Sequence, residues 1–390
     1  MFGERPPNER GRPRPAAGDA EPDRPEPAEP EPVPAAVRPP DAIKGRGAAE
    51  DPPNRFLSAW VEPDPEWNDP DDPGPRTRFL PDASRSVVSR NDSPDIPFAA
   101  SLNPYRGCEN GCSYCYARPT HEYLGLSAGL DFETRIVVKE RAPELLRAQL
   151  SARSWEPQVL ALSGVTDAWQ PVERRRRITR ACLEVLAEHR NPVAVITKSA
   201  LVTRDLDLLQ RLAAHQAAAV NLSITSLDEE LAGRLEPRAA RPHRRLEAIA
   251  AMARGGVPVG VMVAPVIPGL NDHEVPAILE AARAAGAQWA GMILLRLPHG
   301  LRELFAAWLE RHYPARKEKV LSRLREARGG QLNDPRFGSR MTGEGPYAQQ
   351  IQALFQLHRR RLGFAGTPPL STAAFRRPER ARGQRQLFAD

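Results

Sequence analysis

Three cysteines lie within eight residues, and their spacing is the most informative chemical feature of this 390-residue sequence. Cys108, Cys112 and Cys115 follow the pattern C-x3-C-x2-C in a segment that also contains Gly107 and Gly111. Three thiolates in such a loop can reach three corners of one small inorganic group. Thiolate ligands favour zinc or an iron–sulfur cluster. The segment therefore predicts a metal centre.

The two kinds of metal centre differ in how many protein ligands they need. Structural zinc normally takes four, and the remaining cysteine, Cys182, falls on the expected buried face of a helix. The alternatives to a cluster are a Cys3His zinc site completed by His121 and an accidental grouping. A three-cysteine [4Fe–4S] site leaves one iron without a protein ligand. Because chemistry at a metal requires an open coordination position, the cysteine count favours the cluster.

The elements that must position these cysteines alternate between apolar runs and helical stretches. Besides a strand just before Cys108, the expected strands are Pro157–Leu162, Val193–Thr197, Ala219–Thr225, Val257–Ala264 and Trp289–Leu295. The expected helices cover about 171–189, 203–215, 241–254 and 272–285, with further helices at about 301–327 and 345–361. This alternation predicts an α/β fold with a parallel sheet, either open or closed into a barrel. Chemistry in such folds sits at the carboxyl ends of the strands.

Composition separates this body from its flanks. Of the 41 prolines, 19 lie in residues 1–75, and residues 1–54 carry too few large apolar side chains to offset the entropy of ordering, which predicts a disordered tail. We expect an irregular strap over 55–95, the β/α body over 96–300, C-terminal helices over 301–363 and a flexible basic tail over 364–390. No apolar run approaches the roughly 20 residues that cross a bilayer. With few cysteines and no apolar signal-peptide centre, we expect a cytoplasmic location.

The residues around the cysteines resemble those of a known superfamily. The pattern C-x3-C-x-Φ-C, with aromatic Tyr114 before Cys115, is similar to that of radical S-adenosylmethionine (SAM) enzymes. The context Tyr-Arg-Gly-Cys…Cys-x-Tyr-Cys-Tyr resembles the spore photoproduct lyase-like branch, often called DNA repair photolyase-like, and within it an uncharacterised bacterial subgroup. The resemblance implies a partial (β/α)6 TIM-like barrel over about 96–300, a [4Fe–4S] cluster held by the three cysteines, and SAM bound to the open iron.

The same resemblance implies where SAM binds. Its ammonium group would lie at the turn 163–167, its carboxylate at the ends of the next two strands, and its adenine beside the cluster loop and the strand that ends near residue 265. Ser223 and Thr225 alternate with apolar neighbours and so share one side of their strand. Glu236, Arg238 and Arg245 resemble the superfamily's Glu-Pro…Arg stretch, which implies either an ion pair that shapes the site or direct contact with SAM. The expected SAM-binding residues are Tyr114, Gly164, Thr166, Asp167, Lys198, Ser223, Thr225 and Ala264.

The resemblance leaves the substrate open. The named lyase uses a cysteine near the end of its second strand as a hydrogen donor, whereas residues 162–167 contain none, so no catalytic residue is assigned. A nucleic-acid lesion is one implied substrate, and the net charge of +6 permits an anionic partner. The alternatives are an iron–sulfur electron-transfer protein without SAM turnover and a radical SAM enzyme for a peptide or small metabolite. We expect a monomer reduced by a flavodoxin or ferredoxin.

Overall fold

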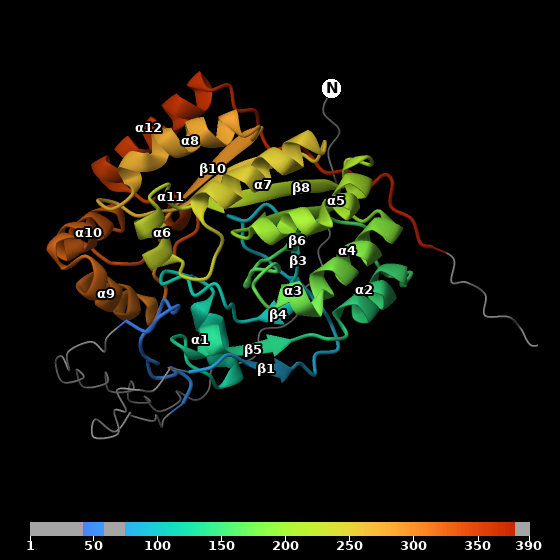
Figure 1. The fold of residues 1–390 in the computed structure, drawn as a ribbon, viewed down its shortest axis with the longest axis horizontal. Coiled ribbons are helices and arrows are strands. Elements are labelled where there is room, and N and C mark those ends of the chain that lie inside the picture. Colours follow the sequence, from blue (N-terminus) through green and yellow to red (C-terminus); the bar gives the residue numbers. More distant parts are fainter. Residues whose placement is uncertain (1–41, 58–74, 379–390) are drawn as a thin grey trace, which may run out of the picture. The chain divides into compact units, whose positions relative to one another are not determined.

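The computed structural model describes residues 42–57 and 75–378, and its centre is a seven-stranded sheet (Figure 1). The strands run in the order β10-β9-β8-β7-β6-β3-β2. Their bounds are β2 Val88–Arg90, β3 Ala100–Leu102, β6 Leu160–Leu162, β7 Val193–Thr197, β8 Ala218–Ile224, β9 Val259–Val266 and β10 Trp289–Leu294. All pairs from β3 to β10 are parallel, and β2 joins β3 in the antiparallel direction. The α/β class and the partial (β/α)6 layout are thereby confirmed.

The expected strands occur in the expected order, with different lengths. β7 has the predicted bounds, because its apolar run is limited by Pro192 on one side and Lys198 on the other. β6 is shorter than predicted and begins at Leu160. It pairs residue for residue with the three-residue β3, from Ala100 opposite Leu160 onward, so its partner limits its length. The strand expected just before Cys108 is β3.

Helices connect the strands and lie along the sheet (Figure 1). Their apolar side chains share one hydrophobic core with those of the strands. The bounds of the helices are α2 Ala142–Ser151, α4 Ile178–His189, α5 Leu206–Ala213, α7 Pro242–Arg254 and α8 Val275–Ala284. In α4, Cys182 and Leu186 lie one turn apart and both are fully buried, as the 3.6-residue period predicts. Cys182 is therefore a core residue. The main hydrophobic core lies between these helices and the strands.

Two helices expected as continuous are interrupted. The stretch 171–189 divides into α3 (Glu173–Arg176) and α4, because Arg177 adopts φ 55° in the left-handed region. The stretch 301–327 divides into α9 (Leu301–His312) and α10 (Pro314–Ala327). Proline fits the first turn of a helix and cannot continue a preceding one. The C-terminal helices also include α11 Ser339–Thr342 and α12 Gly345–Arg361.

The segment 55–95, expected as an irregular strap, contains regular structure where it is described. β1 (Arg78–Pro81) pairs in parallel with β5 (Arg135–Val138), which also pairs with β4 (Tyr105–Arg106). β2 belongs to the main sheet. Residues 58–74 of this expected strap lie outside the described residues. Strand pairing therefore anchors the chain directly after that gap.

Parts of both terminal segments pack on the β/α body, although their composition predicts disorder. Within the expected disordered tail, residues 42–54 are described, and Ala48 and Asn54 are buried. Within the expected flexible tail, residues 364–378 are described; the backbone N–H of Ser371 donates to Gln216 O at 2.9 Å, and Phe375 packs on the core. Residues 1–41 and 379–390 lie outside the described part. No helix described here is long and apolar enough to cross a membrane.

Candidate functional site: the cysteine loop and the strand ends

The three cysteines lie in the loop between β4 and the 3₁₀ helix Arg118–Leu124. All three are free thiols; Cys108 and Cys112 are buried and Cys115 is partly exposed. Cys115 packs with Cys108 in one small apolar cluster and with Cys112 in another, so it lies between the two. Burial raises the pKa of each thiol, and for Cys108 the nearby Asp167 carboxylate and the other two thiols raise it further. A bound metal would offset this increase in pKa, because metal ligation favours the thiolate form.

The three cysteines are the candidate metal ligands of this site. Across residues 42–57 and 75–378, no three His, Cys, Asp or Glu side chains converge on one metal ion. His121 Nε2 lies 2.9 Å from Arg135 O, whereas its buried Nδ1 has no hydrogen-bond partner among the described residues, so this contact does not exclude the Cys3His alternative. Cys115 shares an apolar cluster with each of the other two cysteines, and three thiolates from one loop match the ligand number of an iron–sulfur cluster with one open iron. The loop itself needs Gly107 (φ 79°) and Gly111 (φ 67°), whose positive φ other residues rarely adopt.

The turn after β6 is bonded to the cysteine loop. Thr166 donates from Oγ1 to Gly107 O at 2.6 Å. Asp167 accepts at Oδ2 from Asn110 Nδ2 (3.1 Å) and from Lys198 N (2.9 Å), and at Oδ1 from Thr197 Oγ1 (2.7 Å). These contacts link the loop to the ends of β6 and β7. Thr166 and Asp167 thus bond to the cysteine loop and the neighbouring strand end, and their contact with SAM stays a prediction.

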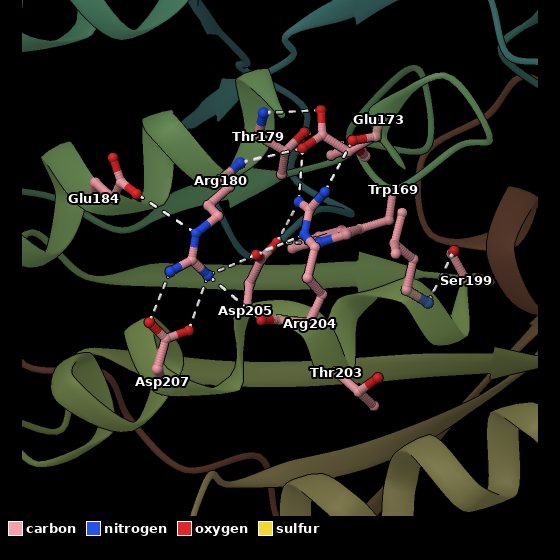
Figure 2. Close-up of polar contacts among 12 residues, drawn as sticks. Trp169, Glu173, Thr179, Arg180, Glu184, Ser199, Thr203, Arg204, Asp205 and Asp207 are labelled. Carbon is pink, nitrogen blue, oxygen red and sulfur yellow. Dashed lines mark hydrogen bonds and ion pairs between the residues drawn. The ribbon is translucent and has the colours of Figure 1, made fainter. Parts of the chain in front are cut away.

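A polar network behind β6 and β7 supports the same strand ends (Figure 2). Asp205, fully buried, accepts from Trp169 Nε1 at 2.9 Å and from Arg180 Nη1 at 3.0 Å. Arg204 donates to Glu173 Oε1 at 2.7 Å. Glu173 is fully buried and also accepts from the backbone N–H of Thr179. Because each buried carboxylate has a cationic partner, the network joins α3, α4 and the segment after β7 at low cost.

Four of the expected SAM-binding residues meet around the buried Glu236. Tyr114 donates its hydroxyl to Glu236 and lies 3.1 Å from Thr225 Oγ1. Thr225 Oγ1 also lies 2.5 Å from Glu236 Oε1 and 3.0 Å from Ala264 O. Lys198 donates from Nζ to Ala264 O at 3.1 Å and lies 3.9 Å from Glu236 Oε1. The structure thereby brings the cysteine loop and the ends of β7, β8 and β9 together.

The expected ion pair between Glu236 and Arg245 is present and almost completely buried. Arg245 also donates from Nη1 to Ser223 O at 2.9 Å. The Ser223 hydroxyl, in contrast, makes no hydrogen bond to any described residue, although the side chain is buried. Gly164 presents its carbonyl to the Tyr116 hydroxyl at 2.6 Å. Ser223 therefore differs from Thr225, whose hydroxyl already has protein partners.

Sequence reasoning missed a second buried ion pair next to the cysteines. Arg118 and Glu133 are both fully buried and paired. Arg118 Nε donates to Cys112 O at 2.9 Å, so this guanidinium holds the backbone of a cysteine directly. Arg118 lies three residues after Cys115, and this position could have indicated its role in the sequence. A guanidinium next to a buried cysteine motif needs hydrogen-bond acceptors, so a carboxylate partner could have been expected. The partner, 15 residues further on, carries no local signal.

Comparisons with known proteins agree with this geometry. The model of the radical SAM superfamily matches residues 102–282. An uncharacterized protein of Mycobacterium tuberculosis H37Rv is 37% identical over 233 residues, 59% of this chain and 67% of that protein. One of Methanocaldococcus jannaschii is 29% identical over 173 residues, 44% and 62% of the two chains. Spore photoproduct lyase, in a point-mutant structure, has a TM-score of 0.52 at 17% identity, over 73% of this chain and 79% of that one. The last likeness shows a shared fold.

Proposed function

We propose that this chain, which belongs to the radical SAM superfamily, binds a [4Fe–4S] cluster through Cys108, Cys112 and Cys115 and SAM at the adjacent strand ends. The observation that carries the proposal is the contact network in which the cysteine loop, through Tyr114, meets Lys198 around Glu236. When bound, these two cofactors supply one-electron cleavage of the SAM sulfonium and a 5′-deoxyadenosyl radical that abstracts hydrogen. The protein residues bind and orient these cofactors.

The strand ends carry groups that suit the carboxylate, the adenine and the ammonium group of SAM. Lys198 Nζ is partly exposed, and its ion-pair distance to Glu236 is long, so it retains donor capacity for the SAM carboxylate. The Ser223 hydroxyl, on the same side of β8 as Thr225, is a second possible donor to the SAM carboxylate. Tyr114 and the backbone at Ala264 lie where adenine would stack or hydrogen-bond. Gly164 presents backbone at the end of β6, where the ammonium group is expected. Glu236 holds these elements together through Tyr114 and Thr225.

Lys198→Ala tests the SAM site. We expect the reconstituted, dithionite-reduced wild type to form 5′-deoxyadenosine from SAM. The variant should keep the iron content and lose roughly 10- to 100-fold in SAM affinity, because a charge-assisted hydrogen bond contributes about 1.5–3 kcal/mol. Lys319→Ala, at an exposed lysine on α10, is the matched control. Calorimetric SAM binding and chromatography of the products are the measurements.

Two results would contradict this assignment. Unchanged SAM affinity in Lys198→Ala would remove Lys198 from the site. A reconstituted wild-type cluster whose EPR spectrum does not respond to SAM would favour the alternative of an iron–sulfur electron-transfer protein. With SAM turnover, an external one-electron donor such as flavodoxin or ferredoxin is part of the proposal.

For the substrate, the proposal is an anionic nucleic-acid strand. At the end of β10, Arg296 lies with its guanidinium carbon 5.8 Å from the ring centre of Tyr116 in the cysteine loop. Arg296 Nε is buried without a hydrogen-bond partner. The Arg296 guanidinium forms no ion pair within the described segments. The nearby Asp95 is already paired with Arg340. A spore photoproduct lyase structure of the same fold, with a TM-score of 0.51, holds a dinucleoside spore photoproduct, which motivates an oligonucleotide as probe.

Binding of a fluorescent single-stranded oligonucleotide across a salt series tests this substrate class. We expect the logarithm of affinity to fall linearly with the logarithm of salt concentration. Arg296→Gln should reduce the slope by about 0.7, the value for one phosphate contact on a single strand. Arg254→Gln, at an exposed arginine at the end of α7, should leave the slope unchanged. Absence of binding at low salt would favour a peptide or small metabolite.

A further inference from the structure

The N-terminal segment Arg46–Asn54 lies directly against the cysteine loop and the residues that follow it. The backbone N–H groups of Gly47 and Ala48 donate to the two carboxylate oxygens of Glu133, at 3.0 and 2.9 Å. Glu133 is fully buried. Arg46 adds a bond from Nη1 to Glu133 O at 3.3 Å. The segment therefore supplies backbone donors to a carboxylate that has no access to water.

Glu133 transmits these contacts to a cysteine. Its carboxylate pairs with Arg118, which is also fully buried. Arg118 donates from Nε to Cys112 O at 2.9 Å and from Nη1 to Gly129 O at 2.8 Å. A continuous chain of buried hydrogen bonds thus runs from the N–H groups of residues 47 and 48 to the backbone of Cys112. Such a chain is stabilising only while every member keeps its partner.

Gly47 also touches the cysteine loop directly. A Cβ atom at Gly47 would lie 1.7 Å from Gly111 O, a backbone atom that cannot move without the loop. Gly111 has φ 67°, and its own Cβ position is blocked by Glu133 Oε2 at 2.7 Å. Gly47 does not have positive φ, so only the close approach requires glycine there. The two glycines and Glu133 form one close-packed contact immediately before Cys112.

The rest of the segment holds the region that follows the cysteines. Glu50 O accepts from Leu130 N at 3.2 Å, and Asn54 Nδ2 donates to Glu122 O at 2.9 Å. Pro52 O accepts from Ser127 Oγ at 2.9 Å. Residues 50–54 therefore brace the stretch 122–130, which carries Arg118's other acceptors. These contacts join residues that are 68 to 80 positions apart in the sequence.

We infer that Arg46–Asn54 is part of the cluster-binding site and keeps the cysteine loop in its ligating shape. The inference rests on the proposed function, since the cluster is what the loop would hold. It goes beyond the superfamily model, whose match begins at residue 102. Gly47 and Ala48 are positioning residues that act through Glu133 and Arg118. By linkage, a segment that stabilises the cluster-bearing loop is itself stabilised by the cluster.

Gly47→Ala in the full chain tests this inference. After anaerobic reconstitution, we expect the variant to release iron to a chelator roughly tenfold faster than the wild type, within the range of ordinary coupling between sites. Gly366→Ala is the matched control, because a Cβ at Gly366 meets no atom within 4 Å and its φ is not positive. The melting temperature of each metal-free protein shows whether the fold survives. Equal release rates in a folded Gly47→Ala variant would overturn the inference.

A second measurement needs no variant. Hydrogen exchange in the wild type should slow at the peptide covering 46–54 on cluster reconstitution, while the peptide covering 364–378 should not change. Unchanged exchange at 46–54 with a full cluster would overturn the inference and leave the proposed function intact. A wild type that takes up no iron would overturn both. The two failures are therefore distinguishable, even where Gly47→Ala does not fold.

Discussion

Replacing Cys108, Cys112 or Cys115 by alanine is expected to abolish assembly of the [4Fe–4S] cluster. The wild type should take up about four iron and four sulfide per chain, and each variant should fall to the background of adventitious iron. The physical reason is the small number of protein ligands. Loss of one of the three thiolates leaves two cysteine ligands for the cluster, because the remaining cysteine, Cys182, is fully buried in α4. Iron and sulfide analysis with the visible absorbance of the cluster provides the measurement.

Cys182→Ala is the matched control for these variants. Cys182 is fully buried in α4, so the substitution removes a thiol of the same kind from the core and should leave iron uptake unchanged. Loss of iron in this control would mean that the iron content depends on correct folding and not on the three cysteines specifically. Stoichiometric zinc in the folded wild type, with no iron uptake, would contradict the cluster and revive the zinc alternative.

The order of strands and helices could be predicted because each apolar run has clear limits. β7 lies between Pro192 and Lys198, which exclude a longer strand. β6 was overestimated because its length depends on β3, whose pairing cannot be seen in the local sequence. The break at Arg177 falls on the last of four consecutive arginines, and nothing in their residue type signals a left-handed conformation. Local composition therefore gives the elements, while pairing and single-residue turns set their ends.

The site was predictable in its chemistry and less so in its connections. Lys198 and Thr225 were chosen as strand-end polar groups, and they do meet beside Tyr114. The Asp167 oxygens accept hydrogen bonds from the neighbouring strand end and from the cysteine loop, and its contact with SAM stays a prediction. The sequence cannot distinguish a side chain that is available to a cofactor from one that accepts hydrogen bonds within the protein, because the distinction depends on which donors the fold brings near.

The N-terminal segment shows why composition misjudged a boundary. Residues 1–54 are rich in proline and charge, which favours disorder. The stretch from Gly45 to Ala49 departs from that composition, but its partner Glu133 lies more than 80 positions away. Every residue except proline has a backbone N–H group, so contacts made by these groups cannot be predicted from residue type. Only the glycine, which permits the close approach, is visible in the sequence.

Glu236→Gln is expected to destabilise the protein by about 3–5 kcal/mol, the cost of removing one member of a buried ion pair. Glu236 is fully buried and its partner Arg245 almost so, and the loss leaves the guanidinium charged without a counter-ion. Urea unfolding of the metal-free protein measures the change in free energy. Glu229→Gln is the control, since Glu229 is half exposed in its pair with His243 and such pairs contribute about 0–1 kcal/mol.

The pH dependence of this difference separates charge from packing. Burial alone would raise the pKa of Glu236, but the positive charges of Arg245 and Lys198 outweigh it and hold the pKa below the ordinary value of 4.5. A depressed pKa in the folded state means that the folded protein binds the proton less readily than the unfolded chain, so the carboxylate stabilises the fold fully above pH 4.5 and progressively less below it. The gap in unfolding free energy between the wild type and Glu236→Gln should therefore narrow on acidification below pH 4.5. A gap that stays constant into strong acid would mean that the glutamine disturbs packing, and the charge of Glu236 would then not be what holds the cysteine loop to the strand ends.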